Sequence, residues 1–426
     1  MEKLVVDGGR PARSEPMPPA YPGGMMLGQE EAEASGAVVL DQSPFRYYGP
    51  NMRYAVQQLE DMISAYAEIP YVLGVTSGTA ALVVALKALG VGYGDKVIVP
   101  ANTFLATPGA VVCSQAVPVF ADVDDSLNIS PESIDKLCED DEVKAIITVP
   151  ILGNLCDMDA IQSIAKKWGI PVIEDIAQSC GATYKGSFAG TIGDIGTLSF
   201  QMNKVLTAGE GGAVITRDAN LFERAVRYHD QGSFREKSRY GIVSDDEENA
   251  FVGQNYRMSE VTGGVLVEQW KRLNGILGVM RARYIAIQQT LAAELPGIKF
   301  RVEPDSTGYT GSHLGMILPN AAIANQFMEY LYAENIQVYP LYGGKPVFML
   351  PQLLHQRTAD VKGSPFAYPF RKPVIYTPDS CPNAVSLMPR TMYLPISPLL
   401  TEQDAVEIAA GIIKVYRSLN ISEQKG

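Results

Sequence analysis

Short apolar runs alternate with longer runs of helical spacing through the first two thirds of the chain. The short runs predict strands at residues 96–99, 118–121, 145–149, 171–173, 197–200 and 213–216, each bounded by turn residues. Apolar positions at helical spacing lie between some of them, as at 81–87 and 159–168. This alternation is typical of an α/β fold with a mostly parallel sheet.

The pattern changes towards both ends of the chain. Residues 1–24 are rich in proline and glycine and lack a period, so we expect an N-terminal arm, followed by a helical run near 28–40. Apolar residues spaced by three and four from 269 to 291 predict a long helix that links two domains. Because 426 residues exceed one small core, we expect a large domain at 25–270 and a smaller α/β domain at 271–426.

Composition narrows the classes of partner. A formal net charge of −12 and a pI near 4.9 argue against nucleic acid, which needs a basic face. No stretch offers the ~20 apolar residues of a membrane helix, and the first residues lack the apolar core of a signal peptide. Five scattered cysteines and three histidines show no disulfide or metal-ligand spacing, so we expect no metal site and a reducing cytoplasm. Because the acidic balance argues against nucleic acid, we expect a small-molecule ligand.

Three chemically notable positions occur in order along the predicted sheet. Lys204 follows a predicted strand and precedes the glycine-rich stretch 209–212. Asp175 ends a buried strand, where open parallel sheets place ligand-binding groups. Ser77 and Thr79 flank a glycine at a predicted helix start, which suits either an N-cap or a phosphate site. Alone, each feature is more often a solvated turn, a cap or a salt bridge.

One cofactor needs all three features together. Pyridoxal 5'-phosphate requires an amine that binds its aldehyde, a carboxylate for its pyridine nitrogen, and hydrogen-bond donors for its phosphate. Lys204 would first hold the cofactor covalently and, once displaced by an amino donor, move a proton between the substrate and cofactor carbons. The sequence therefore predicts a pyridoxal phosphate site with Lys204 as the catalytic residue.

The chain resembles the DegT/DnrJ/EryC1/StrS family of sugar aminotransferases, which belongs to fold-type I of the pyridoxal phosphate enzymes. The likeness rests on SGTAAL (77–82), GDKVIVP (94–100), TF (103–104), ED (174–175), AQS (177–179), GTIGD (190–194), QMNKVLTAGEGG (201–212) and NYRMSE (255–260). It implies a large domain with a mostly parallel seven-stranded sheet and a smaller C-terminal α/β domain.

The resemblance also implies contacts at matching positions. Gly78, Thr79 and Ser199 are expected to bind the phosphate. Phe104 is expected to stack on the pyridine ring and Gln178 to bond the ring oxygen.

Two further roles follow from the resemblance, and both concern the cofactor's surroundings. Asp175 is expected to be the partner of the ring nitrogen. In the family, the asparagine matched by Asn255 reaches the phosphate of the neighbouring subunit, which implies a homodimer with shared active sites.

The acceptor is less clearly indicated. Arg46, Tyr47 and Tyr48 suit a polyhydroxylated or anionic substrate, although an ordinary surface loop is equally compatible. Residues 339–346 occupy the place where relatives contact substrate. Proline at 150 and the stretch 154–156 depart from the family pattern, which leaves the acceptor's identity open.

Together, these features predict an aminotransferase that moves an amino group from glutamine or glutamate to a keto-cyclitol or keto-sugar in secondary-metabolite or glycan biosynthesis. Residues 201–212 and 253–256 most resemble the sequences of the family branch that uses glutamine to aminate cyclitol ketones, such as scyllo-inosose, in antibiotic pathways. One alternative is a pyridoxal phosphate-dependent sugar dehydratase, in which histidine replaces the lysine. The other is a non-catalytic regulatory protein that binds the cofactor.

Overall fold

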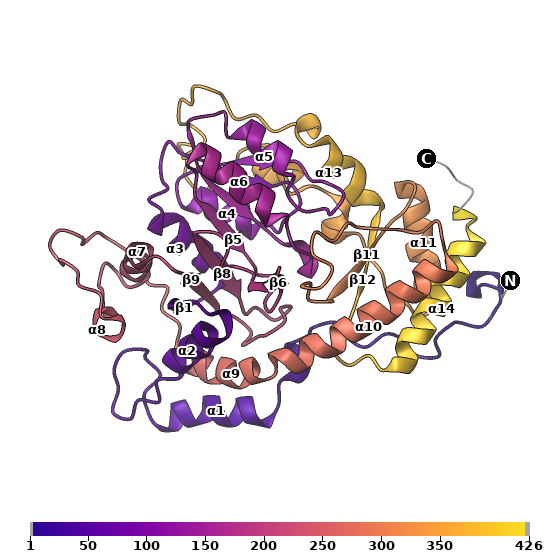
Figure 1. The fold of residues 1–426 in the computed structure, drawn as a ribbon, viewed down its shortest axis with the longest axis horizontal. Helices are drawn as coiled ribbons and strands as arrows, with labels where there is room; N and C mark the ends of the chain where they lie inside the picture. The colour runs from indigo at the N-terminus through magenta and orange to yellow at the C-terminus, as the bar shows by residue number, and fades with distance from the viewer. Residues whose placement is uncertain (1–2, 422–426) are drawn as a thin grey trace.

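The computed structural model describes residues 3–421, and a seven-stranded sheet lies at its centre (Figure 1). The strand order is β1-β9-β8-β5-β4-β2-β3, and β9 alone runs antiparallel to its neighbours. The strands are β1 (Tyr71–Val75), β2 (Lys96–Pro100), β3 (Val117–Ala121), β4 (Val143–Thr148), β5 (Val172–Asp175), β8 (Ile195–Ser199) and β9 (Gly212–Thr216). The mostly parallel seven-stranded sheet is therefore confirmed. Our strand predictions missed only β1 within it.

Successive strand residues enter two different cores, one on each face of this sheet. Ile98 packs with one core, whereas its neighbours Val97 and Val99 pack with the other. All three are fully buried, which explains why the strands read as continuous apolar runs. Helices on both faces supply the rest of each core.

The helices divide between the two faces. Those with residues in the first core include α2 (Ala55–Ala67), α5 (Pro131–Leu137), α6 (Met158–Trp168) and α9 (Glu260–Lys271), and α1 (Gln29–Leu40) packs on α9. Those of the second core include α3 (Gly78–Ala88), α4 (Ala106–Cys113) and α7 (Ala219–His229). The helices predicted near 28–40, 81–87 and 159–168 are thus α1, α3 and α6.

A smaller antiparallel sheet lies beside the long helix α10 (Leu273–Glu294), in the right half of Figure 1. Its strands are β10 (Lys299–Phe300), β11 (His313–Ile317) and β12 (Thr391–Pro395), and its helices include α11 (Ala321–Ala333) and α14 (Glu402–Ser418). The helix predicted from residue 269 to 291 is split, because α9 ends at Lys271 and α10 begins at Leu273. The domain division near residue 270 stays a prediction.

Shorter elements complete the described chain. They are β6 (Thr183–Tyr184), β7 (Ser187–Phe188), α8 (Lys237–Tyr240), α12 (Pro351–Leu354), α13 (Pro382–Leu387) and 3₁₀ turns at Val5–Asp7, Gly24–Met26, Ile151–Gly153, Leu341–Gly344, Val347–Met349, Pro378–Ser380 and Met388–Arg390.

The N-terminal arm packs along the helices of the smaller sheet before the chain reaches the large sheet (Figure 1). The backbone N–H of Ala12 donates to the Glu334 carboxylate at 2.7 Å, and Arg13 pairs with Asp404 on α14 at 2.8 Å. The arm therefore has a fixed course despite its lack of periodic pattern.

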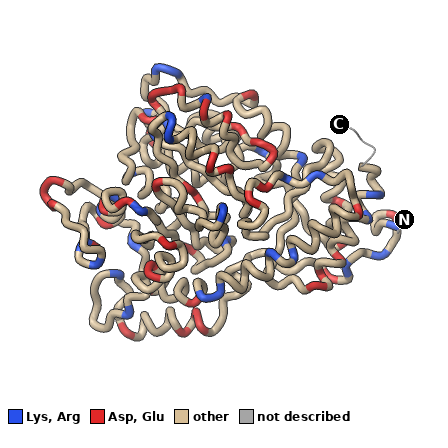
Figure 2. The backbone as a smooth tube through the Cα atoms, in the orientation of Figure 1, with Lys and Arg blue, Asp and Glu red and all other residues tan. Residues whose placement is uncertain are grey.

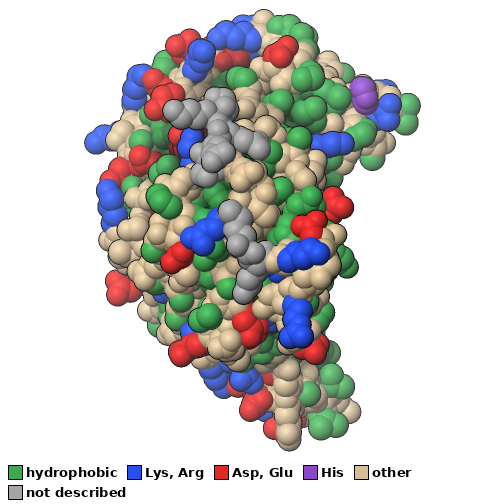
Figure 3. All heavy atoms as spheres, turned by 90° about the vertical axis from the view of Figure 1, so that its right-hand side faces the viewer, with side chains coloured by type: hydrophobic (Ala, Val, Ile, Leu, Met, Phe, Trp, Pro, Cys, Tyr) green, Lys and Arg blue, Asp and Glu red, His purple; other side chains and the backbone are tan. Residues whose placement is uncertain are grey.

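Charges of both signs are interspersed along the chain (Figure 2). On the face that carries the arm and α14, acidic, basic and apolar side chains alternate (Figure 3). Among residues 3–421, no helix is long and apolar enough to cross a membrane.

Candidate active site

Strand register brings the chemically notable residues to one edge of the large sheet. Val75 at the end of β1 pairs with Gly212 of β9, and Gly212 pairs on its other side with Ser199 at the end of β8. β5 runs parallel to β8, so Asp175 at its end lies at the same edge, paired with Thr197. This is the carboxyl edge, where open α/β sheets bind ligands.

A cavity of about 560 Å³ opens at this edge. Seven of the eight residues predicted to contact the cofactor line it: Gly78, Thr79, Phe104, Asp175, Gln178, Ser199 and Lys204. The eighth, Asn255, lies outside its lining. The structure therefore brings together the residues that the sequence placed in one site, apart from the one expected to serve a neighbouring subunit.

The N-terminus of α3 lies at one corner of the cavity. Ser77 caps the helix by accepting from the N–H of Ala80 at 3.1 Å, so the cap and the cavity-lining helix start coexist. Within residues 3–421, the N–H groups of Gly78 and Thr79 donate to no acceptor. The helix dipole adds positive potential there, and both features suit a phosphate.

Close packing explains the glycine at this corner. A Cβ on Gly78 would lie 2.6 Å from the Ser199 Cβ, so only glycine lets α3 approach the end of β8 this closely. Ser199 and the α3 amides therefore face the same small space.

Asp175 is a buried carboxylate that lacks a cationic partner within the described chain. It is 4% exposed, and no lysine, arginine or histidine among residues 3–421 forms an ion pair with it. Burial raises its pKa, while hydrogen bonds from the Ala177 N–H at 3.2 Å and the Thr107 hydroxyl at 3.0 Å oppose this rise. The site thus favours a cationic ligand beside Asp175.

The neighbouring carboxylate shows what a structural role looks like at the same depth. Glu174 is equally buried, but it accepts from three backbone N–H groups, those of Gly190, Ile192 and Gly193, at 2.6–2.9 Å. Backbone N–H groups therefore satisfy the hydrogen-bonding capacity of the Glu174 carboxylate, whereas the Asp175 carboxylate can still accept hydrogen bonds from a ligand.

Lys204 has a lowered pKa and a free amine. Burial in the cavity wall lowers its pKa, and the charges of Asp175 and Glu210 only partly oppose this. In residues 3–421 its ammonium makes no ion pair or hydrogen bond. A lysine that is easily deprotonated and unpaired is suited to attack a carbonyl group.

Gln178 and Phe104 also line the cavity. The Gln178 side chain accepts from the Leu152 N–H at 3.0 Å and donates to the Tyr342 hydroxyl at 2.9 Å. The Phe104 ring is 55% exposed and lies 6.0 Å from the Tyr342 ring. An exposed phenyl ring on a cavity wall offers a surface for a flat ligand.

Asn255 lies on the segment after α7, paired in a β-bridge with Asp230. Its side-chain oxygen accepts only from the Arg257 N–H, at 3.3 Å, within the described chain, and the residue is exposed. Asn255 therefore makes no contact with its own chain's cavity.

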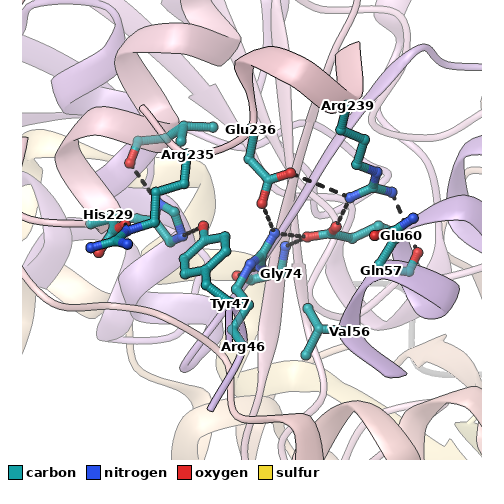
Figure 4. A network of polar contacts seen from close by, with 12 residues as sticks. Arg46, Tyr47, Val56, Gln57, Glu60, Gly74, His229, Arg235, Glu236 and Arg239 are labelled. Carbon is teal, nitrogen blue, oxygen red and sulfur yellow. Dashed lines mark hydrogen bonds and ion pairs between the residues drawn. The ribbon is translucent and has the colours of Figure 1, made fainter. Parts of the chain in front are cut away.

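Of the two interpretations open for Arg46, Tyr47 and Tyr48, an acceptor pocket or an ordinary loop, the structure supports no acceptor contact within this chain's own cavity. Arg46 is buried and donates to Glu60 at 2.7 Å, to Glu236 at 2.8 Å and to the Gly74 carbonyl at 3.0 Å (Figure 4). Its charge is thus used to join the loop, α2 and β1, and it does not line the cavity.

The two tyrosines beside Arg46 are also outside the cavity. The Tyr47 hydroxyl contacts the buried ring of His229 at 3.3 Å (Figure 4), and Tyr48 lies at the surface. A local sequence pattern could not reveal this, because Glu60 and Glu236 lie 14 and 190 residues away from Arg46 along the chain.

Other lining residues were missed because nothing local marks them. Ala20, Tyr21 and Pro22 of the arm line the cavity, as do Thr107 and His313. From the predicted stretch 339–346, the residues that line it are Tyr339, Leu341 and Tyr342.

The residues present fit pyridoxal phosphate. A buried carboxylate without a cation, a free lysine of lowered pKa and unused amides at a helix start share one cavity. A pyridinium, an aldehyde and a phosphate are the groups that would satisfy them.

Comparison with known proteins agrees with this chemistry. The chain is 35% identical over 341 residues to the L-glutamine:2-deoxy-scyllo-inosose aminotransferase of Streptomyces fradiae, covering 73% of this chain and 79% of that protein. It is 32% identical over 316 residues to the GDP-perosamine synthase of Caulobacter vibrioides, covering 72% and 81%. The crystal structure of an aminotransferase from Psychrobacter cryohalolentis superposes with a TM-score of 0.78 at 29% identity, over 95% of this chain and all of that one.

The model of the DegT/DnrJ/EryC1/StrS aminotransferase family matches residues 29–413. This span includes every residue predicted to contact the cofactor. The chain belongs to the DegT/DnrJ/EryC1/StrS aminotransferase family and is a pyridoxal phosphate-dependent aminotransferase.

Proposed function

We propose that this enzyme moves the amino group of glutamine or glutamate to the ketone of a cyclitol. One observation carries the proposal: Asp175 and Lys204 lie in one cavity beside the α3 N-terminus, and neither forms an ion pair within residues 3–421. The named function of the Streptomyces fradiae relative supports the donor and the acceptor class.

The chain's own residues would hold the cofactor by three contacts. Asp175 would pair with the protonated ring nitrogen, since this carboxylate lacks another cation among residues 3–421. Gly78, Thr79 and Ser199 would donate to the phosphate. Bound pyridoxal phosphate supplies an electron sink for the negative charge that develops on the substrate carbon.

Gln178 and Phe104 would fix the plane of the cofactor ring. Tyr342 and Leu152 orient the Gln178 amide, which leaves its position defined before a ligand binds. Phe104 would stack on the ring through its exposed face.

Lys204 would move the proton in each half-reaction. Because burial lowers its pKa, its amine is more often neutral near pH 7 than an exposed lysine is. The neutral amine would take a proton from the donor's α carbon, and the resulting ammonium would be the group that gives a proton back in the same half-reaction. In the second half-reaction, Lys204 would move the proton in the opposite direction, towards the acceptor carbon.

Asn255 would serve the cavity of a second copy of the chain. Its exposed side chain uses one hydrogen bond within the described residues and lies away from its own cavity. We therefore propose a homodimer whose two sites each take one residue from the partner.

A GDP-linked keto-sugar is the second candidate acceptor. The Caulobacter vibrioides relative, named as GDP-perosamine synthase, matches a similar share of the chain. A dehydratase is disfavoured, because the lysine that such enzymes replace is present at position 204.

The test is a panel of ketones offered to the aminated cofactor form. The enzyme is converted with glutamine, freed of donor, and mixed separately with 2-deoxy-scyllo-inosose, scyllo-inosose and GDP-linked keto-hexoses. Return of the visible absorption of the lysine-bound cofactor and the mass of the aminated product identify the acceptor. Reaction with GDP-linked ketones alone would replace the cyclitol by the second candidate, and reaction with none would refute the proposal.

A further inference from the structure

The N-terminal arm forms part of the cavity wall. Ala20, Tyr21 and Pro22 line the cavity, although about 55 residues separate them from the next lining residue, Ser77. The family model begins matching at residue 29, so this piece of wall precedes the matched span.

The inner end of this segment rests on the turn that carries the lysine. The Gly23 N–H donates to the Lys204 carbonyl at 3.1 Å. A Cβ on Gly23 would lie 2.8 Å from the Leu206 Cα and 2.8 Å from the Thr207 nitrogen, so backbone packs directly on backbone here. The arm and the lysine turn therefore hold a fixed relative position.

The outer end of the segment is held by the smaller sheet. The Ser397 hydroxyl, just after β12, donates to the Pro19 carbonyl at 2.9 Å. Tyr21 thus stands between two anchored residues, Pro19 and Gly23, each two positions away. The backbone at Tyr21 has little freedom to move away from the cavity.

The Tyr21 side chain itself has no partner. The ring is 43% exposed, and within residues 3–421 its hydroxyl makes no hydrogen bond and its ring no aromatic or cation contact. The other aromatic residues of the wall are engaged: Tyr342 with Gln178, and Tyr339 with His313 at 2.8 Å. Phe104 is expected to stack on the cofactor, so among the described residues that line the cavity Tyr21 is the exposed aromatic ring left for another ligand.

We propose that the ring of Tyr21 is the surface on which the carbon ring of the acceptor lies, and that the arm thereby sets acceptor specificity. A cyclic polyol with equatorial hydroxyls presents a face of C–H groups, which packs against an aromatic ring while its hydroxyls stay hydrated or bonded at the edge. The cofactor engages the groups at the sheet edge, so this wall is left for the acceptor. The inference rests on the proposed function, because it takes the acceptor to be a polyhydroxylated ring ketone.

The two half-reactions separate this role from a structural one. We expect Tyr21→Ala to raise the KM for 2-deoxy-scyllo-inosose about tenfold, as the loss of one stacked ring would, while the rate of conversion by glutamine stays within about twofold. Tyr21→Phe keeps the ring and should behave as wild type. The matched control is Tyr332→Ala, which removes an exposed tyrosine from α11.

Fluorescence gives a second measurement without turnover. In Tyr21→Trp, adding 2-deoxy-scyllo-inosose to enzyme that has seen no glutamine should change the tryptophan emission. The same addition to Tyr332→Trp should leave it unchanged, which controls for Trp168 and Trp270.

The outcomes distinguish the two proposals. An active wild-type enzyme whose Tyr21→Ala variant keeps its acceptor KM would overturn the role of Tyr21 and leave the proposed function standing. Equal loss of both half-reactions in Tyr21→Ala would also overturn it, since that points to a disturbed lysine turn. A wild-type enzyme that aminates no ketone of the panel would overturn both.

Discussion

The floor and the upper wall of the cavity are built in different ways. The floor consists of strand ends and one helix start, Asp175, Ser199 and Gly78, which adjacent strands of a single sheet bring together. The upper wall consists of Tyr21 from the arm, His313 from β11 and Tyr342 from the 3₁₀ turn after α11, which lie in separate elements of the chain.

The two regions also differ in how their polar groups are satisfied. On the floor, Asp175 and Lys204 lack ionic partners among residues 3–421. On the upper wall, His313 and Tyr339 bond each other, and burial lowers the pKa of His313 to about 3. The floor therefore has charge and bonding capacity to offer a reacting ligand, whereas the wall is neutral and mainly offers shape.

The largest expected effect comes from removing the amine on the floor. Lys204→Ala should abolish both half-reactions and the visible absorption of the lysine-bound cofactor, because no other lysine among residues 3–421 lines the cavity. Lys204→Arg keeps a positive charge and should be equally inactive. Circular dichroism should show an unchanged fold for both variants. Turnover by either at the wild-type rate would contradict the role of Lys204.

Asp175→Asn should have the next largest effect. The amide keeps the size of the side chain but cannot pair with a protonated ring nitrogen, so we expect both half-reactions to slow on the order of 10²–10³-fold. Cofactor should remain bound, since the phosphate corner is intact. Single-turnover rates with glutamine and with the acceptor provide the measurement. Slowing confined to the acceptor step would show that the floor does not act as one unit.

Gly78→Ala tests the corner where the phosphate is expected. The added Cβ would lie 2.6 Å from the Ser199 Cβ, and overpacking of this kind costs about 1–3 kcal/mol. We expect the dissociation constant of the cofactor, measured by equilibrium dialysis, to rise about 10- to 100-fold. The control is Gly109→Ala on α4, where a Cβ meets nothing within 4 Å. Equal cofactor affinity in the two variants would argue against a phosphate site at α3.

The floor could be predicted from the sequence because each part has a local signal. An apolar run predicts a strand, the residues after it lie at the sheet edge, and parallel strands share that edge, so the sequence alone predicts that Asp175 and Lys204 lie together. β1 was missed, although it leads directly into the predicted helix start at Gly78.

The upper wall could not be predicted, because its residues carry no such local signal in the sequence. Its residues are fixed by tertiary contacts, such as Gly23 on the lysine turn and Pro19 on Ser397, which leave no periodic pattern. Arg46 shows the opposite case: a local cluster of polar and aromatic residues is compatible with an acceptor pocket or an ordinary loop, and only the contacts with Glu60 and Glu236, 14 and 190 residues away, show that the guanidinium is held in the core.

The smallest expected effect concerns the protonation of the upper wall. Burial, with the nearby Arg301 charge, lowers the pKa of His313 to about 3, so the unfolded chain binds a proton below about pH 6.5 that the native protein excludes. The free energy of unfolding should therefore fall as the pH drops from 7.5 to 5.5, by about 1.4 kcal/mol from this residue. His313→Asn should remove that part of the pH dependence, and the exposed His355→Asn should not. Denaturant unfolding at the two pH values measures both, and an unchanged fall in His313→Asn would mean that the upper wall takes up a proton and is not the neutral surface contrasted with the floor.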